Sequence, residues 1–333
     1  TKISQGCEHC YAEAWAKRSL ELAEELGSPT ALAFCLTRVS AMLTPYAQWN
    51  RVVDNLQRAI EISRSIGDSR QLEESLGVLA IALGYRAEFE PGREAWREVL
   101  ELAIVREDAQ TQCWGRVGQA ECLMRLGRSH EAVEILDEGM EWVDTTAASA
   151  EVLWVYGVRA WCLWRIGRKD EALVAAQKAL ECMKGSRPVV FWVLPAIMGV
   201  ADVVAESLRG AKGAERAKLQ RMAADVGGIL KVYGWMFPFA RPSDLLYRGV
   251  REWSEGNERS AVNVWRRALD AAREYDMKYE EARLLFLLGS HENGPEAAAQ
   301  IERAAAIFEA LGVGDELTQA RETLAVLKAR PRS

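Results

Sequence analysis

The chain of 333 residues is longer than one compact core usually is, which favours several domains or an array of repeats. Hydrophobic residues make up 49% and charged residues 27%, a balance that excludes a disordered chain, and the abundance of Ala, Leu, Glu and Arg favours helix. The net charge of −6 and the pI near 5.5 argue against nucleic acid or an anionic membrane surface as a partner.

Residues 1–185 repeat with a strict period of 40. A large apolar residue followed by glutamate recurs at five equally spaced positions: Leu20, Ile60, Leu100, Met140 and Leu180. Small residues recur midway between them: Ser40, Ala80, Ala120 and Ala160. Each unit has an apolar stripe at helical spacing, a break and a second stripe, and Gly127 and Gly167 mark two of the breaks. Each unit is therefore predicted to be a pair of helices that stacks on its neighbours.

The period is lost in residues 186–240. We expect two longer helices here, joined to the next region by the aromatic segment 233–239. Because Gly234 and Pro238 interrupt a helix, this segment should leave it and tuck back, either filling a groove or plugging a gap between the two halves. The apolar stretch 188–201 is 14 residues long, too short to span a bilayer, and reads as a buried helix.

The first-helix register returns in residues 241–333, at Gly249 and again 40 residues later at Gly289. Residues 314–328 are predicted to form a final, capping helix. Trp96 and Trp265 lie on second helices, at positions that pack between helices, and are expected in the core.

These columns of small residues resemble the tetratricopeptide repeat. In that family the first helix carries a small residue at repeat position 8, a glycine at 15 starts the turn, and alanines at 20 and 27 lie on the second helix. The match is clearest at Ala160, Gly167, Ala172 and Ala179, and is as good at Gly249, Gly256, Ala261, Trp265 and Ala268. The resemblance covers about 10–185 and 241–312, with a period of 40 instead of 34. It implies an all-α, right-handed superhelical solenoid of about eight antiparallel helix pairs plus a capping helix.

A narrower resemblance concerns the kind of parent protein. The segments LELAEELGSP, WRRALDAAREYDMKYEEARLLFLLG and IERAAAIFEALGVGDELTQA resemble the C-terminal repeats of large bacterial signalling ATPases of the STAND or AAA type. In those proteins the repeats follow a nucleotide-binding switch domain, sometimes with a cyclase, kinase or DNA-binding effector. The resemblance implies a cytoplasmic sensor module with an intramolecular ATPase or effector domain as a possible partner.

Tryptophan is unusually frequent, with 12 residues, and several lie on one face of a first helix. In the tetratricopeptide family the corresponding positions line the concave groove. The implied groove residues are Tyr85, Trp114, Glu121, Arg125, Trp154, Trp161, Trp164 and Arg165. The alternative is that the tryptophans fill space between long helices. If the groove is real, its two arginines, one repeat apart, predict an acidic or carboxylate group on a protein or peptide partner.

Signatures of catalysis are missing from the sequence. Cys7, His9 and Cys10 have the spacing of half a zinc site without a second ligand pair, and the seven cysteines read as reduced thiols. There is no phosphate-binding GxxxxGK[ST] loop, no GxSxG elbow and no triad, so no enzyme activity, cofactor or metal is expected. The predicted function is a protein- or peptide-binding or ligand-sensing module. The alternative is a structural scaffold for oligomerisation or for docking an effector domain, without its own ligand groove.

Overall fold

The computed structural model describes the backbone of residues 2–185, 190–292 and 295–329, and the side chains of residues 13–183, 190–292 and 296–329. The predicted half-site at Cys7, His9 and Cys10 therefore lies outside the described side chains. Within the described ranges the chain forms seventeen α-helices, three short 3-10 helices and no strand.

The N-terminal part of the chain contains α1 Lys2–Glu25, α2 Pro29–Leu43, η1 Thr44–Tyr46, α3 Trp49–Ile66, α4 Ser69–Tyr85, α5 Phe89–Val105, α6 Ala109–Arg125, α7 Ser129–Asp137, α8 Met140–Thr145, α9 Ser149–Arg165 and α10 Lys169–Gly185. The C-terminal part contains η2 Phe191–Val193, α11 Leu194–Leu208, α12 Gly213–Met236, η3 Pro238–Ala240, α13 Arg241–Ser254, α14 Glu258–Glu274, α15 Lys278–His291, α16 Pro295–Ala310 and α17 Gly314–Ala329. Apart from the short α8, the helices from α2 to α16 form seven complete pairs, with α1 before them and the predicted capping helix α17 after them.

The predicted breaks between helices are confirmed at the two glycines. Gly127 and Gly167 have φ of 79° and 82°, the left-handed region that glycine enters without a steric penalty. Beyond the first of them, the amide of Arg128 donates to the carbonyl of Leu123 (2.8 Å), which satisfies a free carbonyl at the end of α6. The chain can therefore reverse within two or three residues and begin the next helix.

The columns of small residues lie where helices approach each other. Ser40, Ala80, Ala120 and Ala160 are each at most 1% exposed. Trp96 and Trp265 are 4% and 1% exposed, so both are core residues as expected. The 40-residue pattern therefore encodes the buried faces of the stacked helices.

Enlarging one of these small residues should overpack a helix contact. Ala160→Leu is expected to lower the free energy of unfolding by about 1–3 kcal/mol, because the three added heavy atoms have no space between α9 and its neighbours. Urea denaturation followed by circular dichroism measures the change. Ala299→Leu, at an exposed position of α16, is the matched control, and equal midpoints for the two variants would contradict the register.

The segment between the two regular regions differs in part from the expectation. Only α12 is long, with 24 residues, whereas α11 has 15. The expectation that Gly234 would end the helix was wrong, because α12 continues to Met236 and leaves helical geometry at Phe237, before Pro238. A Cβ on Gly234 would lie 2.8 Å from the Cβ of Asp244, so this glycine allows α12 to approach α13 closely.

The aromatic connection docks between the two halves, as predicted. Phe239 is fully buried, and its ring centroid lies 4.5 Å from that of Tyr85 and 6.3 Å from that of Trp49. Trp235, at the end of α12, is instead 75% exposed. The connection therefore plugs the gap next to α3 and α4 with one ring and leaves another in solvent.

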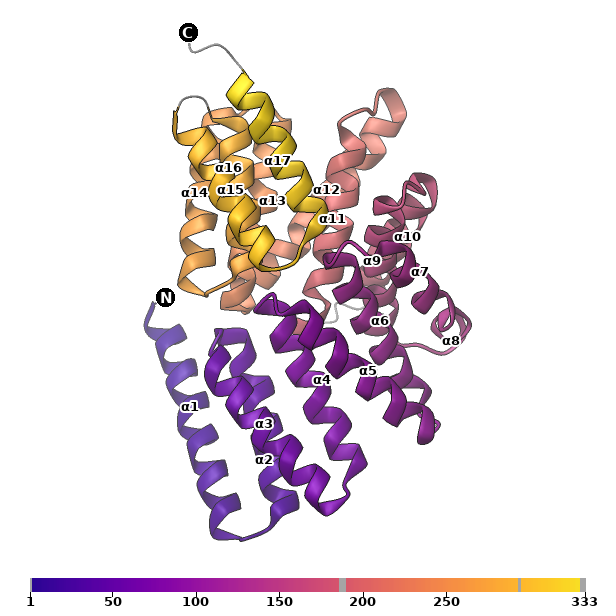
Figure 1. The fold of residues 1–333 in the computed structure, drawn as a ribbon, viewed down its shortest axis with the longest axis vertical. Helices are drawn as coiled ribbons and strands as arrows, with labels where there is room; N and C mark the ends of the chain where they lie inside the picture. Colours follow the sequence, from indigo (N-terminus) through magenta and orange to yellow (C-terminus); the bar gives the residue numbers. More distant parts are fainter. Residues whose placement is uncertain (1, 186–189, 293–294, 330–333) are drawn as a thin grey trace.

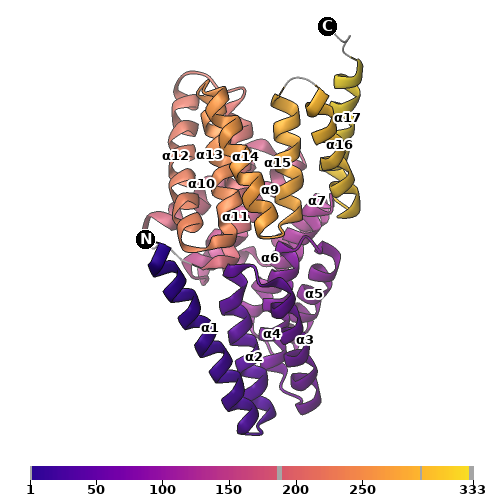
Figure 2. The ribbon, with the colours of Figure 1, turned by 90° about the vertical axis from the view of Figure 1, so that its left-hand side faces the viewer.

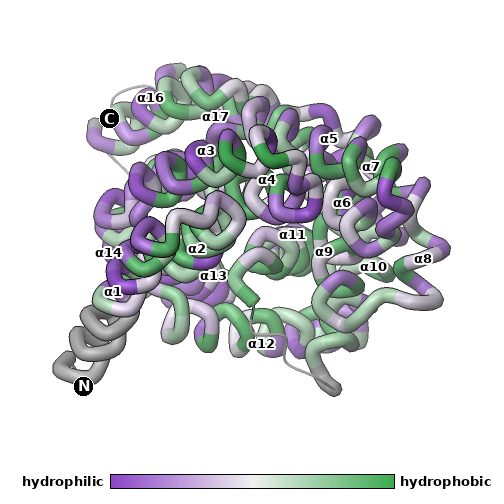
Figure 3. Tube along the Cα trace, turned by 90° about the horizontal axis from the view of Figure 1, so that it is seen from below, coloured by the Kyte–Doolittle hydropathy of each residue, from purple (hydrophilic) through white to green (hydrophobic). Residues whose placement is uncertain are grey.

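One apolar stretch, Phe191–Leu208, could cross a membrane by length and composition, with a mean hydropathy of 1.6 over 18 residues. This stretch is longer than the 14 residues expected from the sequence. Of its residues, 61% are buried inside the fold, and its main helix α11 lies among the other helices near the middle of the molecule (Figure 3). That burial is the pattern of a core helix.

The second half of the array packs over the first half. In Figures 1 and 2, α1 to α4 form one layer and α13 to α17 lie above them, joined along one side by α5 to α12. The indole nitrogen of Trp49 donates to the carbonyl of Tyr275 (2.7 Å), a contact across 226 residues. The inner face of the first half is therefore covered by helices of the second half.

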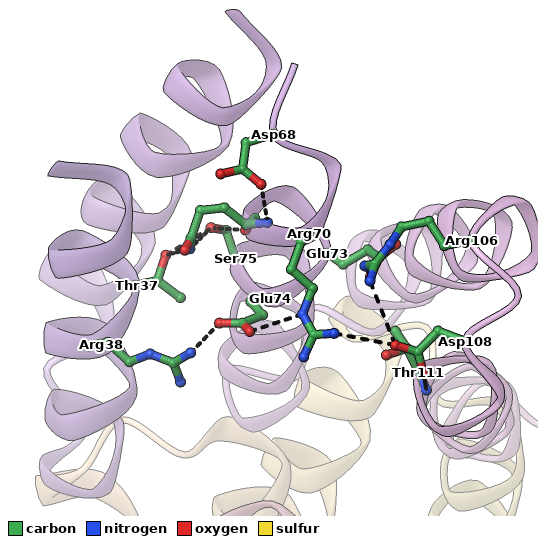
Figure 4. Close-up of polar contacts among 11 residues, drawn as sticks. Thr37, Arg38, Asp68, Arg70, Glu73, Glu74, Ser75, Arg106, Asp108 and Thr111 are labelled. Atoms are coloured by element: carbon green, nitrogen blue, oxygen red, sulfur yellow. Dashed lines mark hydrogen bonds and ion pairs between the residues drawn. The ribbon is translucent and has the colours of Figure 1, made fainter. Parts of the chain in front are cut away.

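Polar side chains link successive first helices on the N-terminal side (Figure 4). Glu74 on α4 pairs with Arg38 on α2 and with Arg70, which in turn pairs with Asp108 (3.5 Å). The carboxylate of Asp108 also accepts a hydrogen bond from the amide of Thr111 and so caps α6. Exposed ion pairs of this kind contribute only about 0–1 kcal/mol each, so the small apolar columns carry most of the stacking energy.

Candidate binding site

The predicted groove residues converge on the interior between α4, α6 and α9 on one side and α15 and α17 on the other. Four of them are nearly inaccessible: Tyr85, Arg125, Trp154 and Trp161, at 6%, 4%, 3% and 2% exposed. The other four are partly buried: Trp114, Glu121, Trp164 and Arg165. The structure thus brings most of the predicted residues together, in a closed interior.

Arg125 lies at the centre of this interior, surrounded by aromatic rings. Its guanidinium carbon lies 4.0 Å from the ring centroid of Tyr279, 4.4 Å from that of Trp161 and 5.8 Å from that of Phe89. Its Nε and Nη1 atoms are buried without a hydrogen-bond partner. The charge is therefore stabilised by ring faces and by nearby carboxylates instead of by direct hydrogen bonds.

Two carboxylates accompany Arg125. Burial raises the pKa of Glu121 to about 7, although Arg125 and a hydrogen bond from the indole of Trp154 (3.4 Å) act in the opposite direction. Burial likewise raises the pKa of Glu280, which is 5% exposed on α15. Beside Arg125, the interior therefore holds two acids that resist ionisation.

The raised pKa of Glu121 predicts a pH-dependent stability. The folded state holds this proton more tightly than the unfolded chain, whose glutamate has a pKa near 4.5. The protonated Glu121 therefore contributes fully to the free energy of unfolding below pH 4.5, and this contribution is lost as the pH rises to about 7. Glu121→Gln should differ little from the wild type at pH 5 and be the more stable protein at pH 8. Urea midpoints at both pH values test this, and a difference that does not change with pH would contradict it.

Arg165 is paired within the chain. Its guanidinium contacts Glu316 and lies 3.2 Å from the carboxylate of Asp315, both in the first turn of α17. The hydroxyl of Tyr279 donates to the same Glu316 (2.9 Å). Trp114 donates its indole hydrogen to Glu151 (3.3 Å). In this structure, α17 therefore supplies the carboxylate that the sequence pattern suggested for a partner.

A large hollow lies elsewhere, between α11, α12, α13, α14, α15 and α17, and we call it the C-terminal groove. Its volume is about 1360 Å³. Leu208, Val250, Phe286 and Leu287 give it an apolar floor, and Gln319 and Thr323 of α17 contribute to one wall. Sequence reasoning missed this groove. One available signal was the charge of residues 209–251, which contain nine Lys or Arg and only three Asp or Glu.

Three rings stack on one another at one end of the C-terminal groove. The ring of Trp253 lies 4.2 Å from that of His291, nearly parallel at 11°, and 5.7 Å from that of Trp265. Burial, together with Arg209, lowers the pKa of His291, so this ring is neutral at pH 7. The buried hydroxyl of Ser290 beside it has no hydrogen-bond partner.

The walls of the C-terminal groove carry more positive than negative side chains. The cations are Arg209, Arg216, Lys231, Arg248 and Arg251, and the acids are Asp244 and Glu255. Burial raises the pKa of Asp244, while Arg248 and Lys231 act against this rise. The groove is therefore basic in a protein whose net charge is −6.

A smaller hollow of about 570 Å³ lies on α3, α4 and α5. Its charged residues are mainly Glu88, Glu94 and Glu98, with Arg86. No group of three or more metal-ligating side chains occurs among the described residues, and the five described cysteines are free thiols.

Comparisons with known proteins agree with this architecture. The family model of the tetratricopeptide repeat matches residues 111–185, and no curated protein matches the chain.

The solved complex of a Rap protein with competence and sporulation factor is 13% identical, with a TM-score of 0.65 over 92% of this chain and 80% of that chain. The apo form of the quorum sensor NprR from B. thuringiensis is 12% identical, with a TM-score of 0.54 over 96% and 86%. The human IFIT1 dimer with m7Gppp-AAAA is 13% identical, with a TM-score of 0.55 over 96% and 78%. These likenesses show the fold: the chain is an all-α solenoid of the tetratricopeptide type.

Proposed function

We propose that this solenoid is a non-catalytic module that binds a peptide or protein segment in the C-terminal groove. The observation that carries the proposal is the groove itself, with its volume of about 1360 Å³, apolar floor and polar walls. Binding sites typically combine such an apolar hollow with a few convergent polar groups. The similarity to a Rap protein solved with competence and sporulation factor, and to a quorum sensor, supports a sensing role.

The residues predicted from the sequence enter this proposal as the interior behind the groove. Their link to the groove is α17, whose first turn pairs with Arg165 and whose residues Gln319 and Thr323 line the groove. A segment entering the groove would press on α17 and so on the contacts around Arg125 and Trp161. We propose that this shared helix carries the binding signal.

The larger context follows from the resemblance to the C-terminal repeats of bacterial signalling ATPases. In that setting the module would be cytoplasmic, and an ATPase or effector domain of the same protein would respond to the state of α17. This part of the proposal rests on the three quoted sequence segments alone.

A scaffold without a ligand is the second candidate, and the first helix pair gives it one specific support. Trp15, Leu26 and Phe34 on or beside α1 and α2 are 67%, 70% and 49% exposed. Large apolar side chains exposed on neighbouring helices are often found at protein contacts. This candidate needs no occupant in the C-terminal groove.

Filling the groove separates the two candidates. Random ten-residue peptides would be displayed and selected on the wild-type protein, and the selected peptides titrated against Ala224→Trp, which places a large ring in the groove from an exposed position of α12. Ala214→Trp, exposed on the same helix outside the groove lining, is the control. We expect binding to be lost only in Ala224→Trp, with melting temperatures unchanged. Equal binding by both variants would place the site elsewhere, and a selection that yields no peptide would favour the scaffold.

A further inference from the structure

We propose that the occupant of the C-terminal groove is an acidic peptide segment, whose carboxylates pair with Lys231, Arg248 and Arg251 while an apolar side chain rests on the groove floor. This inference rests on the proposed function and adds the chemistry of the ligand. The wall that carries these cations is formed by α12 and α13.

The first step is that positive charge is concentrated in the lining of the C-terminal groove. Five cations and two acids line the groove, whereas the whole chain has six more acidic than basic residues. Such a concentration of one sign raises the local concentration of oppositely charged ligands and orients them on approach. A basic hollow in an acidic protein therefore favours acidic segments over neutral or basic ones.

The second step is that the groove cations have few partners. Among the described residues, Lys231 and Arg248 make no ion pair within 4.0 Å, and Arg251 reaches only Glu255 of its own helix at 3.9 Å. In the interior, by contrast, Arg165 already has two carboxylates from α17. These three cations are thus open to carboxylates from outside, whereas Arg209 of the groove pairs with Glu206 (3.0 Å) and the interior Arg165 is satisfied.

The third step is geometry. Arg251 extends toward α12, where its Nη1 lies 3.8 Å from the place that a Cβ on Gly227 would occupy. The two helices therefore bring their cations to the lining of the same hollow to which α11 contributes Leu208 and α15 contributes Phe286. A peptide with carboxylates on one side and an apolar side chain on the other matches both surfaces.

The aromatic residues argue against a nucleic-acid strand as the occupant. Single-stranded nucleic acid is held largely by bases that stack on free aromatic faces. In this groove Trp253, Trp265 and His291 stack on one another, so their faces are already in contact. The acidic net charge of the chain also opposes a long polyanion.

The test uses two pools of fluorescein-labelled ten-residue peptides. One pool is built from Glu, Asp, Leu, Phe, Gly and Ser, and the other has Gln and Asn in place of Glu and Asp. We expect the acidic pool to bind about tenfold more tightly to the wild-type protein at low salt, with the advantage shrinking as salt screens the charges. The double variant Lys231→Gln/Arg248→Gln should lose most of this advantage.

The matched control is Lys218→Gln/Arg221→Gln, which removes two cations from exposed positions of α12 outside the groove lining. It should keep the preference for the acidic pool. Equal binding of both pools, abolished by Ala224→Trp, would overturn the inference and leave the proposed function intact. Binding of neither pool would overturn both. Tighter binding of an oligothymidylate than of the acidic pool would also overturn the inference.

Discussion

Trp161→Ala is expected to lower the free energy of unfolding by about 3–5 kcal/mol, the usual effect of removing a fully buried tryptophan. Its side chain is 2% exposed, and its ring covers the guanidinium of Arg125. Trp161 also lies at the contact of α9 with α11, since a Cβ added to Gly199 of α11 would lie 3.1 Å from the Cβ of Trp161. The variant would therefore leave a cavity and uncover a buried charge. Urea denaturation followed by circular dichroism measures the change.

Trp235→Ala is the control for this variant, because Trp235 is 75% exposed. It should change the stability by no more than about 0.5 kcal/mol. Similar small effects for both variants would show that Trp161 is not a core residue, and would restore an accessible tryptophan groove as the binding surface.

Arg125→Met is expected to be the second large effect, at about 3–5 kcal/mol, because it removes one partner from a buried set of charges. Methionine replaces much of the volume among the three rings, but Glu121 loses the positive charge that lowers its pKa, and Glu280 keeps only that of Arg283. The loss should be smaller at pH 5 than at pH 8, since both carboxyl groups have raised pKa values and are then protonated. Urea midpoints at the two pH values measure this.

The double variant Arg125→Met/Glu121→Gln tests the cause. Removing the uncompensated carboxylate should restore part of the stability at pH 8. Arg128→Met, at an exposed arginine just beyond α6, controls for the general loss of a positive charge. A loss for Arg125→Met that is equal at both pH values and unchanged in the double variant would mean that the carboxylates are not coupled to it.

The helix pairs could be predicted because the information for them is local. Small residues 40 apart and glycines at the breaks determine which faces pack against the next helix, and the structure places Ala120 and Ala160 in those contacts. The docking of the segment ending in Phe239 was predictable for the same reason, since a run of aromatic residues is too apolar for solvent.

The closure of the array could not be read from the sequence. Arg165 and Glu316 are 151 positions apart, and Trp49 meets Tyr275 across 226. No periodic pattern specifies which residues meet after the chain has wound back on itself. Whether a first-helix tryptophan lines a groove or lies in the core depends on that closure, so both interpretations remained open.

The C-terminal groove escaped prediction for a related reason. Its lining comes from six helices, and each of its arginines resembles an ordinary solvent-exposed charge when its helix is considered alone. Only the assembled fold places Lys231 of α12 and Arg248 of α13 along the same hollow.

The location of the bound segment is the most direct test of the central claim. Hydrogen–deuterium exchange would be compared between the free protein and its complex with a selected peptide. The proposal predicts slower exchange in α12, α13, the C-terminal turns of α11 and α15, and α17, with no change in α3 to α5. Slower exchange confined to α3 to α5, around the acidic hollow lined by Glu94 and Glu98, would contradict it.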